Sequence, residues 1–394
     1  MASGLGSFLG LAEVYIGTSG WDYDDWVGPF YESEARMFSQ YCEVFNTVEI
    51  NSTFYSMPNP AFMRRLARAA PRGFVFSAKL YKGITHRKRL NPKLGVESDL
   101  KEYLRAMEPL RSAGKLGAIL VQMPPKPRAE FPYFEEFLSM LPKGFRFAVE
   151  FRHESWLKRE VLKLLEDHGV AYTVVDEPLL PPEVHVTADF AYVRWHGRGQ
   201  RPWYYYLYRE SELREWVPKV MKLMEEVKVI YGYFNNHFRG YAPRNALQML
   251  SLLGLATRRQ REVLRRIEEY FKRGEVEAAR LAAMRALAKG EVEEVIRALA
   301  GDRRFKRALE MPDAEVKVLE INGRIIARVK NYRVVIDLED RTLAHDCEDW
   351  KKRVEGKRIC KHVAKLLLVL PGDLRRRVVE DLIENLDDWS FEVL

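Results

Sequence analysis

Cysteine is scarce in this chain, with three among 394 residues. So few thiols exclude a disulfide-stapled scaffold and indicate a reducing compartment. Apolar runs of about 18 residues are also absent, so we expect no membrane-spanning helix. The first residues, MASGLGSFLGLAEV, lack the basic start and the long apolar stretch of a signal peptide. Together these absences make the cytoplasm the expected location.

The composition is that of a globular protein with a mild excess of positive charge. Hydrophobic residues make up 47% of the chain, which is enough for a large core, and the length suggests two or three domains. Lys and Arg number 64 against 56 Asp and Glu, a net charge of +8. This excess permits a polyanionic partner and mildly favours nucleic acid, but does not require it.

Short runs rich in β-branched and aromatic residues alternate with helical stretches over residues 14–254. The runs are Val14–Trp21, Thr47–Tyr55, Phe74–Leu80, Ala118–Pro124, Phe145–His153, Ala171–Glu177, Phe190–Gly197 and Lys228–His237. Eight repeats in about 240 residues predict an α/β fold, a (β/α)8 TIM-like barrel. A doubly wound open sheet is the alternative, but no Gly-rich phosphate fingerprint follows the first run.

Polar residues gather at the C-terminal ends of these runs, where a barrel of this kind carries its active site. Glu49 and Asn51, two residues apart, share one face of their strand. We expect catalytic roles for Glu49, Asn51, Lys79, Glu150, Asp176 and His196. We expect substrate contacts from Trp21, Tyr55, Arg152, Arg194, Arg198, Asn235, Asn236 and Arg239. Any one of these side chains can instead be a satisfied structural group.

Two kinds of chemistry fit this set. Carboxylates and imidazoles can hold one or two divalent metals and generate a hydroxide. A metal-free site would use Glu49 or Asp176 as base and Lys79 or an arginine as electrostatic stabiliser. The cationic side chains would attract an anion such as phosphate, although Glu150 and Arg152 can equally form an internal ion pair.

Aromatic side chains are common near the same strand ends. The stretch Arg198–Tyr208, RGQRPWYYYLY, combines arginines with a run of rings. Such a stretch can stack nucleic-acid bases or sugars, or simply pack a loop. A carbohydrate-binding cleft would look much the same.

Several long motifs resemble one known family. They are GTSGWDYDDWVGPFY (17–31), FNTVEINSTFY (45–55), AVEFRHESW (148–156) and YFNNHFRGYAPRNA (233–246). With them, residues 14–254 resemble the DUF72 (YecE-like) proteins. The resemblance implies a TIM-barrel-like fold, similar to the barrels of the endonuclease IV and xylose isomerase type. It leaves the reaction open, because barrels host many chemistries.

Residues 255–312 change in character to Ala, Leu, Glu, Arg and Lys at helical spacing. Gly274, Gly290 and Gly301 interrupt them, which predicts three or four short helices packed as hairpins. Clustered arginines make the segment basic, and they form either a solvated helix face or a surface that follows phosphates.

Residues 313–394 predict a small zinc-binding domain with C-terminal helices. Asn322 and Gly323 between two β-rich runs indicate a hairpin. His345 and Cys347 form one close pair, Cys360 and His362 another, and twelve residues lie between the pairs. Two thiolates and two imidazoles in this arrangement suit a structural Zn²⁺.

This segment, about residues 315–370, is similar to a SWIM zinc domain, whose pattern is Cys-x-Cys, a gap, then Cys-x-His. His345 stands where the first cysteine would be, so Asp346 or water could serve as that ligand instead. The resemblance implies a DNA or protein partner.

The expected organisation is a barrel (1–254), a basic helical region (255–312) and the zinc domain (313–394). The function expected first is a nucleic-acid-binding enzyme, a nuclease (a phosphodiester hydrolase) or DNA-repair type protein with its active site on the barrel. A divalent metal in the barrel stays open. The alternatives are a non-catalytic nucleic-acid-binding or adaptor protein and an enzyme acting on a small sugar-phosphate-like anion.

Overall fold

The computed structural model describes residues 12–199, 204–386 and 388–394. Their contacts form two compact units, Met1–Glu268 and Glu269–Leu394. Residues 1–11, on which the prediction of no signal peptide rests in part, lie outside the described residues. Within the described residues, no helix is both long and apolar enough to cross a membrane.

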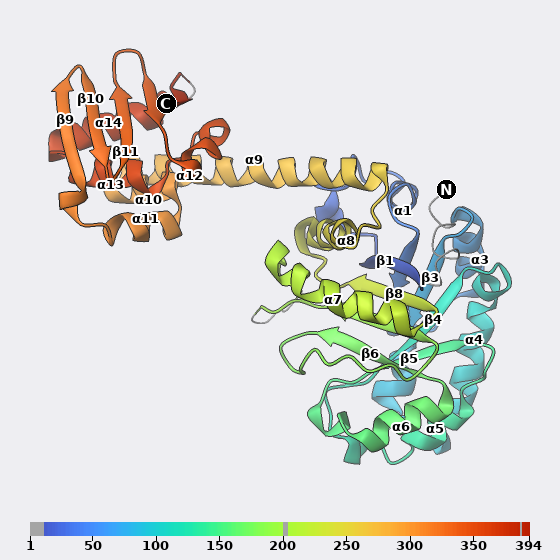
Figure 1. Ribbon diagram of the computed structural model, residues 1–394. Coiled ribbons are helices and arrows are strands. Elements are labelled where there is room, and N and C mark those ends of the chain that lie inside the picture. The colour runs from blue at the N-terminus through green and yellow to red at the C-terminus, as the bar shows by residue number, and fades with distance from the viewer. Residues whose placement is uncertain (1–11, 200–203, 387) are drawn as a thin grey trace. The chain divides into compact units, whose positions relative to one another are not determined.

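Eight parallel strands close into a barrel in the first unit (Figure 1). They are β1 (Glu13–Ser19), β2 (Thr47–Ile50), β3 (Val75–Lys79), β4 (Leu116–Gln122), β5 (Arg146–Glu150), β6 (Ala171–Asp176), β7 (Phe190–Trp195) and β8 (Val229–Phe234). Strand β1 pairs with both β2 and β8, which completes the ring. The predicted (β/α)8 barrel is therefore confirmed.

Helices follow most of the barrel strands. They are α1 (Met37–Cys42), α2 (Ser52–Tyr55), α3 (Pro60–Ala69), α4 (Val96–Ser112), α5 (Phe134–Met140), α6 (Arg159–His168), α7 (Glu210–Glu226) and α8 (Tyr241–Leu252). Local sequence sets their ends. Asn59 caps α3 by accepting the Ala61 N–H at 2.8 Å, and Pro60 occupies the first turn. Helix α6 ends at Gly169, whose φ of 63° is left-handed.

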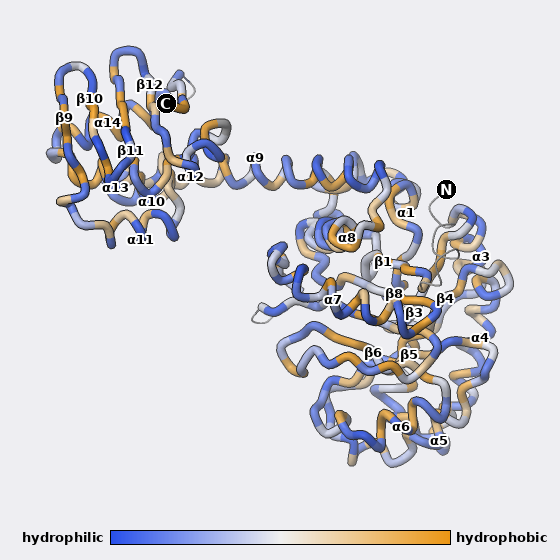
Figure 2. The backbone as a smooth tube through the Cα atoms, viewed as in Figure 1, coloured by the Kyte–Doolittle hydropathy of each residue, from blue (hydrophilic) through white to orange (hydrophobic). Residues whose placement is uncertain are grey.

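Side chains alternate between the inside and the outside of the barrel wall. The inner layer is apolar and aromatic, with Ala118, Ala148, Phe190, Tyr192 and Tyr231 in one buried cluster. Both faces of a parallel barrel strand are covered, so the strands are largely apolar along their length (Figure 2). Polar inward-facing side chains are not confined to the C-terminal strand ends, because Thr47 and Ser77 meet the Tyr233 hydroxyl nearer the start of their strands.

The second unit packs helices against a five-stranded sheet of order β13-β12-β11-β10-β9. Its strands are β9 (Val316–Asn322), β10 (Arg324–Val329), β11 (Tyr332–Asp337), β12 (Thr342–His345) and β13 (Ser390–Val393). Its helices include α10 (Val292–Ala300), α11 (Asp302–Leu309), α12 (Glu348–Lys351), α13 (Lys361–Val369) and α14 (Gly372–Glu384). The predicted hairpin is confirmed, with Gly323 at a φ of 75° between β9 and β10.

Gly290 and Gly301 separate α9 (Arg258–Ala288), α10 and α11 as predicted, but α9 is not a short helix, because it runs unbroken for 31 residues. Gly274, which we expected to end a helix, lies inside it. One glycine costs a helix only about 1 kcal/mol relative to alanine, and the surrounding Arg, Glu, Ala and Leu are strong helix formers. A single glycine without a proline or a cap was therefore too weak a stop signal.

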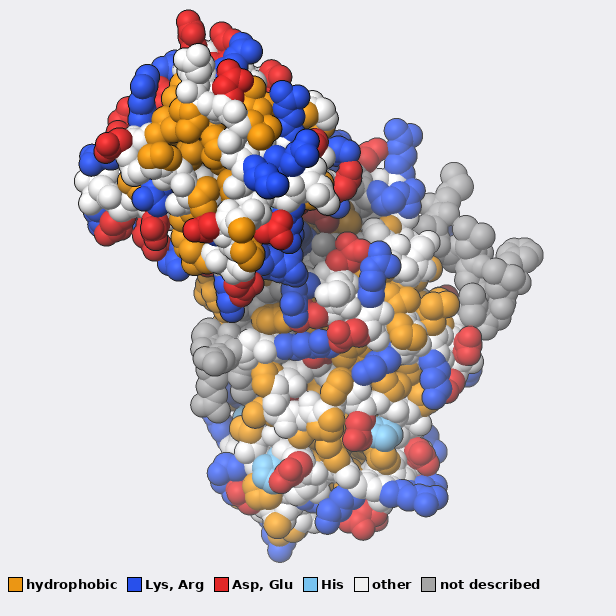
Figure 3. Space-filling model, turned by 60° about the vertical axis from the view of Figure 1, so that its left-hand side comes forward, with side chains coloured by type: hydrophobic (Ala, Val, Ile, Leu, Met, Phe, Trp, Pro, Cys, Tyr) orange, Lys and Arg blue, Asp and Glu red, His pale blue; other side chains and the backbone are white. Residues whose placement is uncertain are grey.

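Apolar side chains gather on one surface of the second unit (Figure 3). In the same unit, edge strand β9 exposes Val318, Leu319 and Ile321. A register shift opposite Ile326 and Ala327 marks a bulge in this strand pair, a feature that often limits further pairing at an edge.

Candidate functional site

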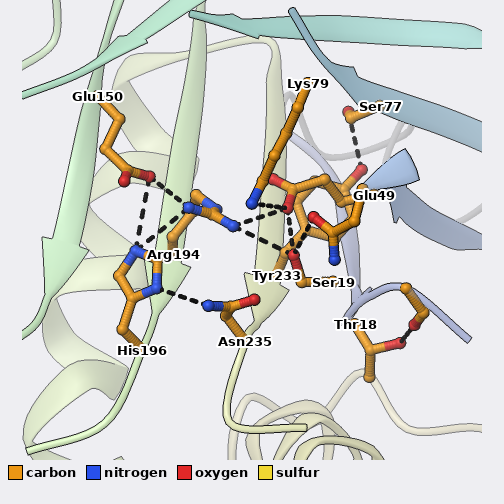
Figure 4. A network of polar contacts seen from close by, with 12 residues as sticks. Thr18, Ser19, Glu49, Ser77, Lys79, Glu150, Arg194, His196, Tyr233 and Asn235 are labelled. Carbon is orange, nitrogen blue, oxygen red and sulfur yellow. Dashed lines mark hydrogen bonds and ion pairs between the residues drawn. The ribbon is translucent and has the colours of Figure 1, made fainter. Parts of the chain in front are cut away.

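Arg194 on β7 is the centre of a buried polar network inside the barrel (Figure 4). Its guanidinium lies 2.8 Å from Oε1 of Glu49 on β2 and 2.5 Å from Oε2 of Glu150 on β5. It also donates to Oγ of Ser19 at 3.1 Å. None of the side chains of Arg194, Glu49 and Glu150 is exposed. One cation thus pairs with two carboxylates from strands far apart in the sequence.

These two carboxylates are held in their ionised form. Burial opposes ionisation of Glu49, but Arg194 and Lys79 outweigh burial and lower the pKa. Burial is likewise outweighed at Glu150, where Arg194 and Arg152 hold the pKa well below its usual value. Arg152 donates to Glu150 Oε1 from Nε at 2.7 Å, so the expected internal ion pair is present.

His196 is a neutral member of the same network. Burial and the charge of Arg194 lower its pKa to about 3. Its Nδ1 lies 3.0 Å from Nδ2 of Asn235, and its Nε2 lies 3.5 Å from Oε2 of Glu150. Its Nε2 also lies 3.3 Å from Nη1 of Arg194, which like the amide NH₂ can only donate, so each ring nitrogen faces a donor. His196 therefore orients groups at neutral pH rather than carrying charge.

Lys79 at the end of β3 is the one amine in this network. Its Nζ lies 3.9 Å from Glu49 Oε1 and 5.8 Å from the centre of the Phe54 ring. Burial and the nearby Arg194 lower its pKa to about 7, although Glu49 pulls in the opposite direction. At neutral pH a large fraction of Lys79 is therefore the free amine, which is a base and a nucleophile.

Glu177 is a candidate that we did not predict from the sequence. It follows β6, it is 6% exposed, and neither carboxylate oxygen has a hydrogen-bond partner among the described residues. Strand alternation places it on the inward face with Ala171, which belongs to the interior cluster. Burial raises its pKa to about 7, and Arg152 and Glu150 act on it in opposite directions. Counting alternate residues from Ala171 could have identified it.

Asp176, the predicted base beside it, lies on the outer face of the wall. Its carboxylate accepts the Trp216 indole N–H at 2.6 Å and the Arg198 Nε–H at 3.0 Å, both from outside the strand ring. Asn236 donates to the Tyr206 carbonyl and to Asn245. These contacts give Asp176, Arg198 and Asn236 partners within the protein. The catalytic role of Asp176 and the substrate contacts of Arg198 and Asn236 stay predictions. Residues 200–203 of the stretch 198–208 lie outside the described residues.

Predicted site residues at the mouth come from the segments that follow β1, β2 and β8. Asn51 and Trp21 line a pocket of about 270 Å³ together with Gly20, Tyr23 and Phe62. Tyr55 is 65% exposed, and Nζ of Lys82 lies 5.2 Å from its ring. Arg239, with a left-handed φ of 49°, lies 5.8 Å from the Tyr205 ring. The structure thus brings Asn51 and Trp21 together, whereas Tyr55 ends the short helix α2 that follows Asn51 and Arg239 follows β8.

The second unit brings His345, Cys347, Cys360 and His362 together as predicted. Their four ligand atoms lie within 4.8 Å of one another, and all four side chains are buried. Among the described residues this is the one group of three or more Cys, His, Asp or Glu side chains close enough to share an ion. Such a cluster can bind a metal.

His345 is oriented as a metal ligand. Its Nδ1 lies 2.6 Å from the Arg333 carbonyl, which can only accept, so Nδ1 carries the proton. Its Nε2 is buried without a hydrogen-bond partner among the described residues. A ligand imidazole characteristically donates its other N–H in this way. Asp346, the alternative ligand, instead accepts the Arg333 N–H at 3.1 Å.

The arginines that begin α9 are largely engaged with protein groups. Arg258 pairs with Glu262, Arg259 with Glu43, and Arg266 with Glu32 and the Phe30 carbonyl. Most of these groups are exposed, so each pair contributes little to stability. This part of the helix therefore presents less free positive charge than its sequence suggested.

The first unit matches a known family. The model of the family described as "Protein of unknown function DUF72" matches residues 15–268. The UPF0759 protein YunF of Bacillus subtilis is 27% identical over 268 residues, covering 61% of this chain and 95% of that protein. The UPF0759 protein YecE of Escherichia coli K12 is 31% identical over 170 residues, covering 41% of this chain and 59% of that protein.

Solved structures are similar to the same part of the chain. A DUF72 family protein from Thermotoga maritima shares 35% identity with a TM-score of 0.56, covering 61% of this chain and 99% of that one. A DUF72 family protein from Enterococcus faecalis, at 24% identity and a TM-score of 0.56, covers 62% of this chain and 96% of its own. The second likeness supports the fold alone.

Proposed function

Because the chain belongs to the DUF72 family, whose description assigns no reaction, we propose a function from the geometry of its barrel. The protein is an enzyme that performs acid–base chemistry on an anionic substrate at the C-terminal ends of the strands. Nucleic acid is the substrate class that we favour, with cleavage next to a phosphodiester as the reaction.

The pair Lys79 and Glu177 carries this proposal. An efficient general acid or base has a pKa near the working pH, whereas Glu49 and Glu150 are held ionised by Arg194 and are weak bases. Lys79 and Glu177 both have a pKa of about 7 and both experience the charges of Glu150, Arg152 and Arg194. Lys79 is the proposed base or nucleophile, and Glu177 the proposed acid.

Two features favour nucleic acid. The net charge is +8. At the barrel mouth, cations lie beside exposed rings, Lys82 beside Tyr55 and Arg239 beside Tyr205. A ring that can stack a base next to a cation that can meet a phosphate is typical of sites for single strands.

We further propose that the His-Cys-Cys-His cluster holds a structural Zn²⁺ in a SWIM-like module. Two thiolates and two imidazoles suit zinc, and the free Nε2 of His345 fits such a site. Zinc would supply folding stability to the second unit. The module would bind the nucleic acid or a protein partner.

A small phosphorylated molecule is the second candidate substrate. The pocket beside Asn51 and Trp21 measures about 270 Å³, near the lower limit for small-molecule sites. A pocket of that size accepts one sugar or nucleotide more readily than a continuous strand.

The test uses labelled single- and double-stranded DNA and RNA, with and without Mg²⁺, Mn²⁺ or Zn²⁺, scored for gel shift and for fragments. We expect fragments from the wild type and from the surface control Lys101→Met, and none from Lys79→Met or Glu177→Gln. Fragments that persist in both site variants would remove this pair from the mechanism. A gel shift without fragments would favour a non-catalytic binding protein. The absence of both a gel shift and fragments would favour a small-molecule substrate.

A further inference from the structure

The Lys79 amine is placed for a ligand rather than for a protein partner. Its Nζ makes no hydrogen bond to any residue that the structure describes, and the nearest carboxylate oxygen, Glu49 Oε1, is 3.9 Å away. That oxygen already accepts from Arg194 and Ser19, and the other accepts from Tyr192 at 2.7 Å. Glu49 thus has three other donors, and the amine lies beside it without a hydrogen bond.

The backbone of Lys79 is held firmly in place. Its carbonyl oxygen accepts from Thr53 Oγ1 at 2.7 Å and from the Tyr103 hydroxyl at 2.8 Å. Both donors are buried, which fixes the end of β3. The side chain is 11% exposed, so a small group can reach it. A rigid backbone that carries a reachable, unbonded amine is the arrangement that covalent catalysis by lysine requires.

We propose that Lys79 forms an imine with the aldehyde or ketone carbon of a phosphate-bearing substrate. This inference rests on the proposal that the active site lies at this end of the barrel, but it does not require that the substrate be nucleic acid. A phosphate-bearing aldehyde occurs both as a free sugar phosphate and as a base-free sugar within a DNA strand.

The step balances without an oxidant or a reductant. The Nζ lone pair forms a C–N bond to the carbonyl carbon, and the C=O π electrons move to oxygen, which takes a proton. Nζ then loses a proton, the C–O bond breaks, and the oxygen leaves as water after accepting a second proton. Glu177 is the proposed donor of that second proton, and the remaining positive charge resides on the iminium.

The surroundings of the amine favour a phosphate. Arg152 reaches partly to solvent with a side-chain exposure of 17%. His86 is neutral, because burial together with Arg152 and Lys82 lowers its pKa to about 4. His86 and the Lys79 amine lie 5.1 and 5.8 Å from the centre of the same Phe54 ring, and Arg152 acts on both. Guanidinium and ammonium groups are the usual partners of phosphate oxygens.

Lys79 should also differ from other lysines in reactivity. With a pKa of about 7, half of its amines are unprotonated at pH 7. A lysine with the ordinary pKa of about 10.4 is unprotonated in about 1 molecule in 2,500. Burial will reduce this advantage, so we expect Lys79 to react at least about tenfold faster than exposed lysines.

Trapping with sodium cyanoborohydride tests the proposal. Full-length protein at pH 7 is incubated with glyceraldehyde 3-phosphate, and the modified lysines are identified by peptide mass spectrometry. Glyceraldehyde is the uncharged match, and glycerol 3-phosphate, which has no carbonyl, is the competitor. Lys79→Arg retains a cation but cannot form the imine, and Lys101→Arg is the surface control. A parallel arm uses an oligonucleotide with one base-free deoxyribose, matched to its tetrahydrofuran analogue.

We expect one dominant adduct on Lys79, formed faster with the phosphate than without it and slowed by glycerol 3-phosphate. The adduct should persist in Lys101→Arg and vanish in Lys79→Arg, with circular dichroism showing that both variants are folded. The arm that gives the faster adduct identifies the source of the aldehyde. Labelling of Lys79 no faster than that of exposed lysines in both arms would overturn the imine.

The two proposals fail in different ways. Nucleic-acid cleavage that needs Lys79, without trapping on Lys79 in either arm, would overturn the imine and leave the acid–base site standing. Faster trapping by glyceraldehyde 3-phosphate than by the oligonucleotide, without cleavage, would support the imine and overturn the favoured substrate. If neither trapping nor cleavage is observed, both proposals are overturned.

Discussion

The guanidinium of Arg194 lies 2.8 Å from the Glu49 carboxylate, and neither side chain has any exposed surface. The same guanidinium lies 2.5 Å from Glu150. The cation joins β7 to β2 and β5 through the barrel interior and keeps both carboxylates ionised. The charged groups of the site are therefore also part of the barrel core. Some substitutions among them should lower stability, and others should change reactivity.

Replacing Arg194 should destabilise the barrel. Arg194→Met leaves two ionised carboxylates buried with fewer partners, and breaking a buried pair in this way costs about 3–5 kcal/mol of unfolding free energy. Urea denaturation measures the loss. Arg214→Met, which breaks an exposed pair with Glu210, is the control and should cost less than about 1 kcal/mol. Equal losses in the two variants would contradict the structural role of Arg194.

Replacing Lys79 should change how stability depends on pH. Its pKa is about 7 in the folded chain, below the ordinary value of about 10.4, so between these values the unfolded chain binds more protons. The contribution of Lys79 to the free energy of unfolding of the wild type therefore rises as the pH increases between these two values. Lys79→Met removes the cost of burying a protonated amine. Its free energy of unfolding should therefore exceed that of the wild type by up to a few kcal/mol below pH 7, and the difference should fade toward pH 10. Denaturation of both proteins at matched pH values measures it, and a gain independent of pH would argue against the lowered pKa.

Replacing Glu177 should change the pH dependence of activity. The proposed reaction needs Lys79 unprotonated and Glu177 protonated, and both have a pKa of about 7, so the rate should peak near pH 7. Glu177→Gln should slow the reaction about 10²–10⁴-fold and abolish the decline above pH 7. Trapping rates between pH 5 and 9 provide the profile.

Asp176→Asn is the matched control for Glu177. It weakens the bonds to Trp216 and Arg198, at a cost of about 1–3 kcal/mol, but should leave the pH of the maximum unchanged. If Asp176→Asn rather than Glu177→Gln removes the decline above pH 7, the acid has been assigned to the wrong residue.

Metal content should depend on His345 and not on Asp346. Elemental analysis of the purified chain should find about one zinc per molecule. His345→Ala should lower that content and destabilise the second unit, because it removes the buried Nε2 that has no protein partner. Asp346→Asn should retain the zinc, since Asp346 accepts a backbone N–H and does not belong to the cluster. Loss of zinc in Asp346→Asn alone would reverse the two roles.

Local patterns were sufficient for much of the architecture. The eight strands follow from repeated apolar runs, and the start of α3 follows from Asn59 and Pro60. The sequence also predicted the cluster of His345, Cys347, Cys360 and His362. It contains two close pairs, and two residues separated by a single residue stay near each other in most backbone conformations. Helix α9 was missed because helix length depends on the sum of many weak preferences, and Gly274 is only one of them.

Asp176 and Glu177 mark the limit of sequence reasoning at the site. The sequence alone determined that two carboxylates end the sixth strand, that the fold is a barrel and that polar groups collect at one of its ends. Only the tertiary structure decided which carboxylate faces inward, because a shift of one residue exchanges the two faces of a strand. Closure of the barrel also brings Arg194 to Glu49 across 145 residues of chain. The pKa values of Lys79 and Glu177 result from burial and from charges on distant strands, which no local pattern records.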